Sequence, residues 1–378
     1  MKIAIIGGGA SGCVLAGLLA EEGIEVSLFE QSSRLLRKVL ATGNGRCNFT
    51  NDSISTEYYI GDQKLIGKVL GDFSAKKFFH RLGLAYHTLE SGMVYPATMQ
   101  AKSLVDRLEV WLKHLNVKIY YNKEITKLEK KDGHFFIDGK SFSICVLATG
   151  GSYGIEKKEF SLGYSLAKDM GHTLTGLSAG IVSLTSPDKE LYLPLQGTKL
   201  LCKVSYKEKS FLDDLLFTNY GFSGIGILKL SNTLLMDGGD RFEIDLLPFW
   251  QEEDLKRDFQ RLAKAFPSWS DVEILSGYLP EELARYILYR SKDLLSSIGL
   301  LKKMQVNVSG CRKKDHGQIT CGGVNTQDID DHLESKLTKG LFFTGEILDI
   351  QGECGGYNLH FAWASAHHVF QSIRRSSV

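Results

Sequence analysis

The architecture of this chain follows from residues 2–30, which read KIAIIGGGASGCVLAGLLAEEGIEVSLFE. Residues 2–6 are a short apolar run, which predicts a buried strand, and a glycine-rich turn separates them from an apolar stretch over 10–22 that predicts a buried helix. Residues 25–29 predict a second strand that ends at Glu30. Because parallel strands need a crossover connection, this order predicts two parallel strands joined by a helix.

The same N-terminus has some features of a secretory signal peptide, since one Lys precedes an apolar run and small residues follow. The spacing of the glycines favours the strand, turn and helix instead. No apolar run reaches the roughly 20 residues that a membrane-spanning helix needs. Seven cysteines without a CxxC pair indicate free thiols in a reducing compartment. We therefore expect a cytoplasmic protein with no membrane partner.

Gly7, Gly9 and Gly12 form a G-x-G-x-x-G pattern directly after the first strand. In a dinucleotide-binding turn the first glycine makes the tight turn, the second lets a pyrophosphate approach the backbone, and the third allows close helix–strand packing. Free N–H groups at the helix start attract phosphates. Glu30 is placed to accept hydrogen bonds from a ribose, and its charge disfavours NADP. The alternatives are a ligand-free glycine turn and a solvated acid at the strand end.

Composition excludes several functions. The net charge of +1 provides no field that would attract nucleic acid. We find no cluster of Cys or His with metal-ligand spacing, so we expect no metal. Residues 251–298 mix basic and acidic side chains and predict solvated helices, although aromatic and basic residues interleave in YILYRSKDLL.

Further elements follow along the chain. We expect helices over 74–82 and 101–115, hairpins over 84–95 and through KKDGHFF, and strands over 117–121, 143–148 and 341–344. Residues 188–248 predict mostly short strands and turns, residues 304–326 predict strand and turn, and residues 356–374 predict a helix.

A second glycine cluster favours FAD over NAD. GLFFTGEILDIQGECGGYNLHFAWASAHH begins at residue 340 and places Gly355 and Gly356 before the C-terminal helix. A helix start left bare by glycines favours negative charge, such as that of a reduced flavin. A merely capped helix would explain one glycine, but not GGYN together with TGE.

Several stretches resemble the three-domain bacterial flavoproteins that include aminoacetone oxidase and the BaiN-type reductases. They are IIGGGASG, RKVLATGNGRCNFTN, LATGG, LLFTNYGFSG, ITCGGVNTQDID and GLFFTGEILDIQGECGGYNLHFAWASA. The resemblance implies an α/β fold: a two-dinucleotide-binding-type, Rossmann-like FAD domain with an inserted β-barrel domain and a small helical domain. The expected boundaries are 1–185 and 327–378 for the FAD domain, 186–249 and 300–326 for the barrel, and 250–299 for the helices.

The resemblance also implies contacts with non-covalent FAD. These fall on Gly7, Gly9, Gly12, Glu30, Arg37, Lys38, Gly43, Arg46, Gly150, Gly345, Glu346, Gly356, Tyr357 and Asn358. The full predicted cofactor site adds their neighbours Gly8, Ala10, Ser11, Gln31, Asn44, Gly45, Cys47, Asn48, Ala148, Thr149, Gly151 and Gly355, together with Ile125 and with Gly322 and Gly323, which are expected to approach the flavin. In one place the sequence departs from the family pattern, because Leu36 stands where a glycine is expected.

The loop LATGNGRCNFTN, residues 40–51, is expected to lie along the flavin, because Gly43 and Gly45 permit close backbone approach. Arg46 is a candidate to neutralise pyrophosphate or a flavin oxygen. Cys47 and Cys354 are interpreted as small structural residues, not as redox or attachment sites. His360 is interpreted as structural, and the catalytic acid or base stays unassigned.

The function expected from these observations is an FAD-dependent oxidoreductase that transfers a hydride between a small organic substrate, an amine or an unsaturated compound, and FAD. NAD(P)H is a candidate electron donor. The alternatives are an RNA-modifying flavoprotein, which the near-neutral charge disfavours, and a non-catalytic flavin-binding redox sensor. Substrate, oligomeric state and the choice between oxidase and reductase stay open.

Overall fold

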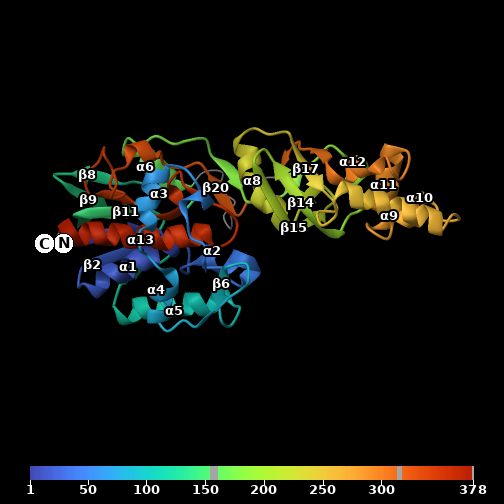
Figure 1. Ribbon diagram of the computed structural model, residues 1–378. Helices are drawn as coiled ribbons and strands as arrows, with labels where there is room; N and C mark the ends of the chain where they lie inside the picture. Colours follow the sequence, from blue (N-terminus) through green and yellow to red (C-terminus); the bar gives the residue numbers. More distant parts are fainter. Residues whose placement is uncertain (154–160, 313–316, 377–378) are drawn as a thin grey trace. The chain divides into compact units, whose positions relative to one another are not determined.

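The chain divides into two units, which are described separately here from a computed structural model (Figure 1). Unit 1 comprises Met1–Ser178 and Ile319–Val378, and unit 2 comprises Ala179–Gln318. The structure describes residues 1–153, 161–312 and 317–376. Part of the strand-and-turn stretch expected over 304–326 therefore lies outside the described residues.

Unit 1 is built on a five-stranded parallel sheet in the order β21-β11-β1-β2-β7. Its strands are β1 (Lys2–Ile6), β2 (Glu25–Phe29), β7 (Lys118–Tyr120), β11 (Ile144–Leu147) and β21 (Leu341–Phe343). Ile3 of β1 is in register with Val26 of β2 and Ile144 of β11. The central strands are apolar along nearly their whole length because helices cover both faces of a parallel sheet.

The predicted strand–helix–strand unit is confirmed: α1 (Ala10–Glu21) connects β1 to β2. Most of α1 is buried, and it lies beside α13 (Tyr357–Ser376) (Figure 1). The expected helices over 74–82 and 101–115 are α4 (Ala75–Arg81) and α5 (Ala101–His114). A mixed α/β fold with a parallel, dinucleotide-binding type of sheet is therefore confirmed.

Smaller elements complete unit 1. Its other helices are α2 (Arg37–Ala41), α3 (Gln63–Leu70) and α6 (Leu162–Asp169), with 3-10 turns η1 (Thr42–Gly45), η2 (Thr56–Tyr58), η4 (Thr326–Asp328) and η5 (Gly345–Ile347). Its other strands are β3 (Thr50–Asn51), β4 (Tyr59–Ile60), β5 (Tyr86–Thr88), β6 (Met93–Pro96), β8 (Glu129–Lys131), β9 (His134–Ile137), β10 (Lys140–Phe142), β20 (Ile319–Cys321) and β22 (Gln351–Gly352). Strand β12 (Ser178–Gly180) spans the boundary between the units.

Unit 2 contains a seven-stranded antiparallel sheet in the order β18-β17-β14-β15-β16-β13-β19. Its strands are β13 (Leu184–Thr185), β14 (Lys199–Tyr206), β15 (Lys209–Phe217), β16 (Gly221–Ser223), β17 (Arg241–Asp245), β18 (Met304–Asn307) and β19 (Gly310–Cys311). The described pairings place β18 and β19 at the ends of this order, so closure into a barrel stays a prediction.

Strands β14 to β17 confirm the expectation of mostly short strands and turns over 188–248, but one long helix there was not expected. Helix α8 (Ile225–Met236) packs against β14 and β15. Its sequence, IGILKLSNTLLM, is apolar over much of its circumference, so it lacks the clear 3.6-residue alternation of a surface helix. The short helix α7 (Lys189–Tyr192) lies in the same stretch.

The remaining helices of unit 2 are α9 (Glu252–Ala265), α10 (Asp271–Leu275), α11 (Glu281–Ser291) and α12 (Ser297–Lys302). Their apolar side chains share one core with the sheet, which includes Phe242 of β17 and Phe259 of α9. Arg261 pairs with Asp258 and Arg285 with Glu281 along their own helices. The prediction of charged, solvated helices is therefore confirmed, whereas the division into three domains stays a prediction.

Within the described part of the chain, no helix combines the length and the apolar character needed to cross a lipid bilayer.

Candidate functional site

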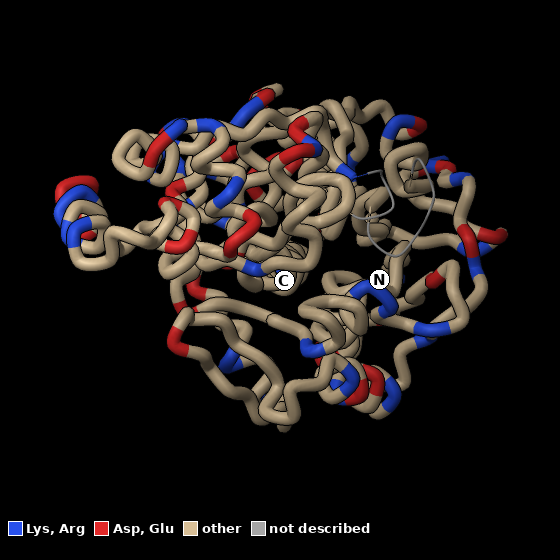
Figure 2. Tube along the Cα trace, turned by 90° about the vertical axis from the view of Figure 1, so that its right-hand side faces the viewer, with Lys and Arg blue, Asp and Glu red and all other residues tan. Residues whose placement is uncertain are grey.

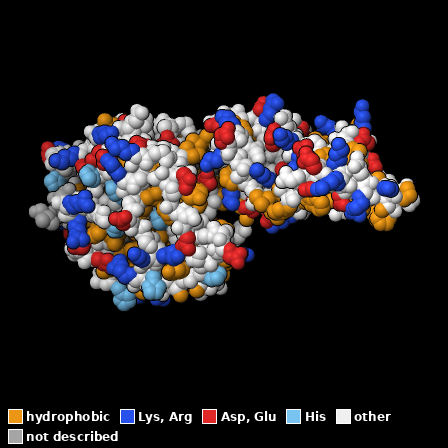
Figure 3. Space-filling model, viewed as in Figure 1, with side chains coloured by type: hydrophobic (Ala, Val, Ile, Leu, Met, Phe, Trp, Pro, Cys, Tyr) orange, Lys and Arg blue, Asp and Glu red, His pale blue; other side chains and the backbone are white. Residues whose placement is uncertain are grey.

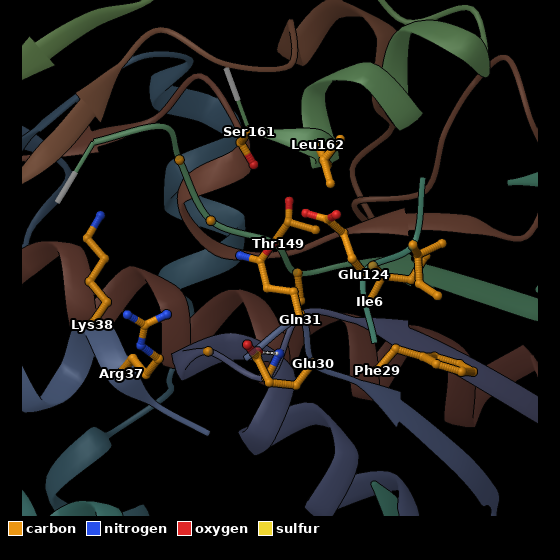
Figure 4. Close-up of a pocket in the computed structure, with 18 of the residues that line it drawn as sticks. Ile6, Phe29, Glu30, Gln31, Arg37, Lys38, Glu124, Thr149, Ser161 and Leu162 are labelled. Atoms are coloured by element: carbon orange, nitrogen blue, oxygen red, sulfur yellow. Dashed lines mark hydrogen bonds between the residues drawn. The ribbon is translucent and has the colours of Figure 1, made fainter. Parts of the chain in front are cut away.

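A cavity in unit 1 opens where the parallel strands end (Figure 4). Ligands of open α/β sheets bind at this edge, beyond the carboxyl ends of the strands. The cavity is lined by Ile6, Gly7, Gly8, Gly9, Phe29, Glu30, Gln31, Leu36, Arg37, Lys38, Lys123, Glu124, Ile125, Ala148, Thr149, Gly150, Gly151, Tyr153, Ser161, Leu162, Gly163 and Leu166. The segments that follow β1, β2, β7 and β11 thus converge on one space.

The glycines of the first turn differ in what surrounds them. A Cβ on Gly7, whose φ is +113°, would lie 2.3 Å from the carbonyl oxygen of Ala148, and a Cβ on Gly12 would lie 1.9 Å from the carbonyl oxygen of Gly7. Close packing therefore explains both. A Cβ on Gly9 would have no atom within 4 Å beyond those of its neighbours in the chain. The protein itself does not require glycine there, whereas a phosphate approaching the start of α1 would.

Glu30 is fixed at the rim of the cavity. Its Oε2 accepts a hydrogen bond of 2.8 Å from the backbone N–H of Gly8. Its Oε1 accepts bonds from the backbone N–H of Ser32 at 2.8 Å and from the Ser32 hydroxyl at 2.6 Å. A carboxylate has about four acceptor positions, so Glu30 can still accept from a ribose hydroxyl.

The cavity is basic on one side and apolar on the other. Arg37 and Lys38, both on α2, lie together on one side, and Ile6 and Phe29 lie on the opposite side (Figure 4). Leu162 and Leu166 of α6 add to the lining. A ligand with a charged middle and a flat apolar end, such as an adenosine diphosphate moiety, fits this distribution.

Lys38 is held by residues far away in the sequence. Its Nζ lies 2.5 Å from Oε2 of Glu346 in η5, and it donates a 3.0 Å bond to the carbonyl oxygen of Tyr153. Glu346 Oε1 also accepts a 2.8 Å bond from the backbone N–H of Thr320. The Thr320 hydroxyl in turn accepts from the backbone N–H of Ser152 at 2.8 Å. This network joins four segments beside the cavity.

The loop over 40–51 turns sharply but does not line this cavity. Gly43 and Asn44 adopt left-handed conformations, and so do Gly45 and Cys47. The Asn48 side chain accepts from the backbone N–H of Val94 at 3.2 Å. The Asn48 amide therefore bonds to the backbone of β6.

The start of α13 packs against this loop. Trp363 Nε1 donates to the carbonyl oxygen of Phe49 at 3.0 Å, and Asn51 Nδ2 donates to that of Gly355 at 3.0 Å. Thr50 Oγ1 lies 2.7 Å from His360 Nδ1. The loop over 40–51 and the region around the start of α13 are thus bonded to each other, which no local sequence pattern could show.

The predicted cofactor residues therefore fall into two groups. The cavity brings together Gly7, Gly8, Gly9, Glu30, Gln31, Arg37, Lys38, Ile125, Ala148, Thr149, Gly150 and Gly151. It does not include Ala10, Ser11, Gly12, Gly43, Asn44, Gly45, Arg46, Cys47, Asn48, Gly322, Gly323, Gly345, Glu346, Gly355, Gly356, Tyr357 and Asn358. For both groups, contact with a cofactor stays a prediction.

Some lining residues were not predicted. Lys123 and Glu124 follow β7. They reach the cavity because β7 lies beside β2 in the sheet, an order that the sequence does not show. Ser161, Leu162 and Gly163 begin α6, a helix that the sequence reading passed over. The signal that could have found Lys123 and Glu124 is their place just after the strand expected over 117–121.

The buried thiols are poor nucleophiles. Burial raises the pKa of Cys47 to about 12, and burial followed by the charge of Glu30 raises that of Cys13. Both are therefore protonated near neutral pH, which supports a structural role for Cys47. Among the described residues, no group of three or more His, Cys, Asp or Glu side chains is arranged to hold a metal ion.

The sequence has relatives with named activities. Residues 1–372 match the family described as "HI0933-like protein Rossmann domain". A "3-dehydro-bile acid delta(4,6)-reductase" of Clostridium scindens is 32% identical and covers 97% of this chain and 97% of that protein. A "ribosomal RNA dihydrouridine synthase" of Haemophilus influenzae is 28% identical and covers 98% of each chain.

Two solved structures share the fold. A 3-ketosteroid-delta4-(5alpha)-dehydrogenase of Rhodococcus jostii has a TM-score of 0.54 at 13% identity and covers 98% of this chain and 96% of that chain. A flavocytochrome c3 fumarate reductase has a TM-score of 0.51 at 15% identity and covers 100% of this chain and 78% of that chain.

Proposed function

Because the chain belongs to the HI0933-like family and is an FAD-dependent oxidoreductase, we propose that it reduces a carbon–carbon double bond conjugated to a carbonyl group, with FAD bound non-covalently. The relatives' names support this substrate class. A 3-dehydro-Δ4 bile acid carries a double bond next to a ketone, and dihydrouridine forms when the uracil double bond next to a ring carbonyl is saturated. The two substrates differ in size and charge but share this group.

The cavity supports the cofactor assignment. The space at Gly9 accommodates phosphate, Glu30 accepts from a ribose, and the apolar side near Ile6 and Phe29 suits adenine. Arg37 brings positive charge to the side of the cavity that we assign to the pyrophosphate, whereas the charge of Lys38 is compensated by Glu346. The single observation that carries the assignment is Gly9, whose missing side chain serves no packing need in the protein.

The protein's own groups bind and orient, whereas FAD supplies the chemistry. FAD, when bound and reduced, would supply the hydride that saturates the double bond, and solvent would supply the proton. Glu30 and the bare turn at Gly9 would hold the dinucleotide, with Arg37 of α2 on the side of its phosphates. We propose NAD(P)H as the electron donor.

RNA is a second candidate substrate, because the relatives named ribosomal RNA dihydrouridine synthase match nearly the whole chain. Charge weighs against it. The net charge is +1, and basic and acidic residues are interspersed along the chain and over the face shown (Figures 2 and 3). Sequence-independent RNA binding needs clustered positive charge and falls steeply with salt.

The test is an anaerobic reoxidation experiment. Protein loaded with FAD is reduced with NADH or NADPH and mixed with a 3-oxo-Δ4 steroid, with a ribosomal RNA transcript, or with buffer. We expect the visible flavin band to return with the steroid and not with buffer. Return only with the transcript would establish the RNA alternative. Return only with oxygen, together with bleaching of the oxidised protein by aminoacetone, would show an amine oxidase instead.

A further inference from the structure

Tyr95 carries a hydroxyl group without a strong hydrogen-bond partner. It lies in β6, where Met93 and Tyr95 share a half-buried face and Val94 and Pro96 share the buried one. Among the described residues, the acceptor for its O–H group is Sδ of Met93 at 3.7 Å. A thioether is a weak acceptor, so the phenol keeps a proton that a better acceptor can take.

The ring of Tyr95 lies against the loop over 40–51. A Cβ built on Gly43 would lie 3.6 Å from Cε1 of this ring. Gly43 and the three residues after it, Asn44, Gly45 and Arg46, are exposed. Because Tyr95 is only half-buried and its neighbour in the loop has no side chain, a ligand can contact it from outside the protein.

The strand that carries Tyr95 is connected to the start of α13. Met93 is in register with Asn51 of β3, and Asn51 Nδ2 donates to the carbonyl oxygen of Gly355 at 3.0 Å. The N–H groups at a helix start favour negative charge, and the guanidinium of Arg46 does so too. When a hydride adds to a double bond next to a ketone, negative charge develops on the carbonyl oxygen. This region therefore combines positive potential with a proton donor, as such a reaction needs.

The surroundings of the Tyr95 phenol suit a proton donor. Burial raises its pKa, and the positive charge of Arg46 opposes this rise. The phenol is therefore protonated near neutral pH, and Arg46 lowers the cost of removing the proton. A general acid needs both properties.

We propose that Tyr95 is the catalytic residue that passes a proton from solvent to the substrate. This inference rests on the proposed function and on the expectation that the flavin lies along the loop over 40–51. The double bond takes up the hydride at one carbon. The O–H bond of Tyr95 breaks as its proton forms a C–H bond at the other carbon, beside the carbonyl group. The electron pair of the O–H bond stays on the phenolate, which Arg46 stabilises until solvent protonates it.

The test measures how two acceptors reoxidise the reduced protein. Wild type and Tyr95→Phe are loaded with FAD, reduced without oxygen, and mixed with the 3-oxo-Δ4 steroid or with ferricyanide, which takes electrons without a proton. We expect Tyr95→Phe to react about 100-fold or more slowly with the steroid, as expected for loss of a general acid, and at the wild-type rate with ferricyanide. Tyr86→Phe is the matched control. Tyr86 is opposite Pro96 on the buried face of the same small sheet, so this variant should keep both wild-type rates.

A second measurement needs no turnover and no variant. Tetranitromethane nitrates accessible tyrosines, and mass spectrometry of peptides measures nitration of the oxidised, FAD-loaded wild type with and without the steroid. We expect the steroid to protect Tyr95 but not Tyr289 of α11, which is 81% exposed.

The outcomes separate the inference from the proposed function. A wild-type steroid rate in Tyr95→Phe, or a Tyr95 that is not nitrated or not protected, would overturn the inference alone. Nitration of the wild type decides the matter if Tyr95→Phe does not fold. If the steroid does not reoxidise the reduced wild type, the proposed function is overturned as well.

Discussion

Lys38 and Glu346 are 308 positions apart in the chain, and their charged groups lie 2.5 Å apart beside the cavity. The two side chains are 35% and 19% exposed. The pair therefore connects α2, whose Lys38 lines the cavity, to η5, which follows the last strand of the sheet. It fixes the cavity wall at Lys38, whose charge Glu346 compensates.

Glu346→Gln should cost stability because it leaves Lys38 without a counter-charge in a partly buried place. We expect a loss of about 1–3 kcal/mol in the free energy of unfolding, measured by urea denaturation without cofactor. Lys102→Met is the control, since its pair with Asp106 is exposed and should contribute less than about 0.5 kcal/mol. Equal effects of the two substitutions would contradict a structural role for the Lys38–Glu346 pair.

Alanine at Gly9 and at Gly12 should have opposite consequences. The methyl group of Gly9→Ala would have no atom within 4 Å beyond those of its neighbours in the chain. The free energy of unfolding of this variant should therefore stay within about 0.5 kcal/mol of that of the wild type. Its FAD affinity should fall more than about tenfold, because the methyl group occupies the space assigned to phosphate.

Gly12→Ala places its Cβ 1.9 Å from the carbonyl oxygen of Gly7 and should lose about 3 kcal/mol of stability or more. Urea denaturation and a flavin fluorescence titration measure the two effects. A Gly9→Ala protein with unchanged FAD affinity would contradict the assignment of this turn to the phosphates.

Leu36 adopts a left-handed backbone conformation, which glycine favours, at the position where the family pattern has a glycine. Its φ is 57° and its ψ is 26°, at the position that precedes α2. Left-handed residues other than glycine cost about 1 kcal/mol. Both Leu36→Ala and Leu36→Gly lose the buried leucine, but the glycine variant should be the more stable by about 1 kcal/mol. Thermal or urea unfolding of the pair measures this, and the reverse order would show that the left-handed backbone does not persist.

His360 makes stability depend on pH. Burial lowers its pKa from 6.5 to about 4, so the folded protein holds the ring neutral. Between these two pH values the unfolded chain binds more protons. The contribution of His360 to the free energy of unfolding is therefore fully present above pH 6.5. It is lost as the pH falls toward 4, which lowers the free energy of unfolding by at most about 3 kcal/mol.

His360→Gln can still bond Thr50 but does not titrate, so its unfolding free energy should change less between pH 7 and pH 5 than that of the wild type. A His360→Gln protein with the full wild-type dependence would show that another group is responsible.

Local signals predicted the first part of the fold well. The strand over 2–6, the turn at Gly7 and the strand over 25–29 were found because apolar periodicity and glycine spacing act within a few residues. Helix α8 was missed because its apolar residues lie on more than one side. Lys123, Glu124 and the start of α6 could not be placed, because their position at the cavity depends on which strands become neighbours.

The bonds between distant motifs were also beyond the sequence. Nothing in the residues around Phe49 shows that Trp363 donates to its carbonyl oxygen, and nothing around Lys38 names Glu346 as its partner. Conversely, the family pattern has a glycine at position 36, and Leu36 does adopt a left-handed conformation. The spacing of a motif thus predicts the backbone conformation within it, whereas the hydrogen-bond partners of side chains depend on the tertiary structure.

The most direct test of the account is the visible absorption spectrum of the purified protein, followed by denaturation and identification of the cofactor that is released. We predict a flavin spectrum, taken up on addition of FAD if the cofactor is lost in purification, and FAD in the supernatant after the protein precipitates. A colourless protein that does not take up FAD would contradict the central claim. A flavin that stays with the precipitate would contradict non-covalent binding.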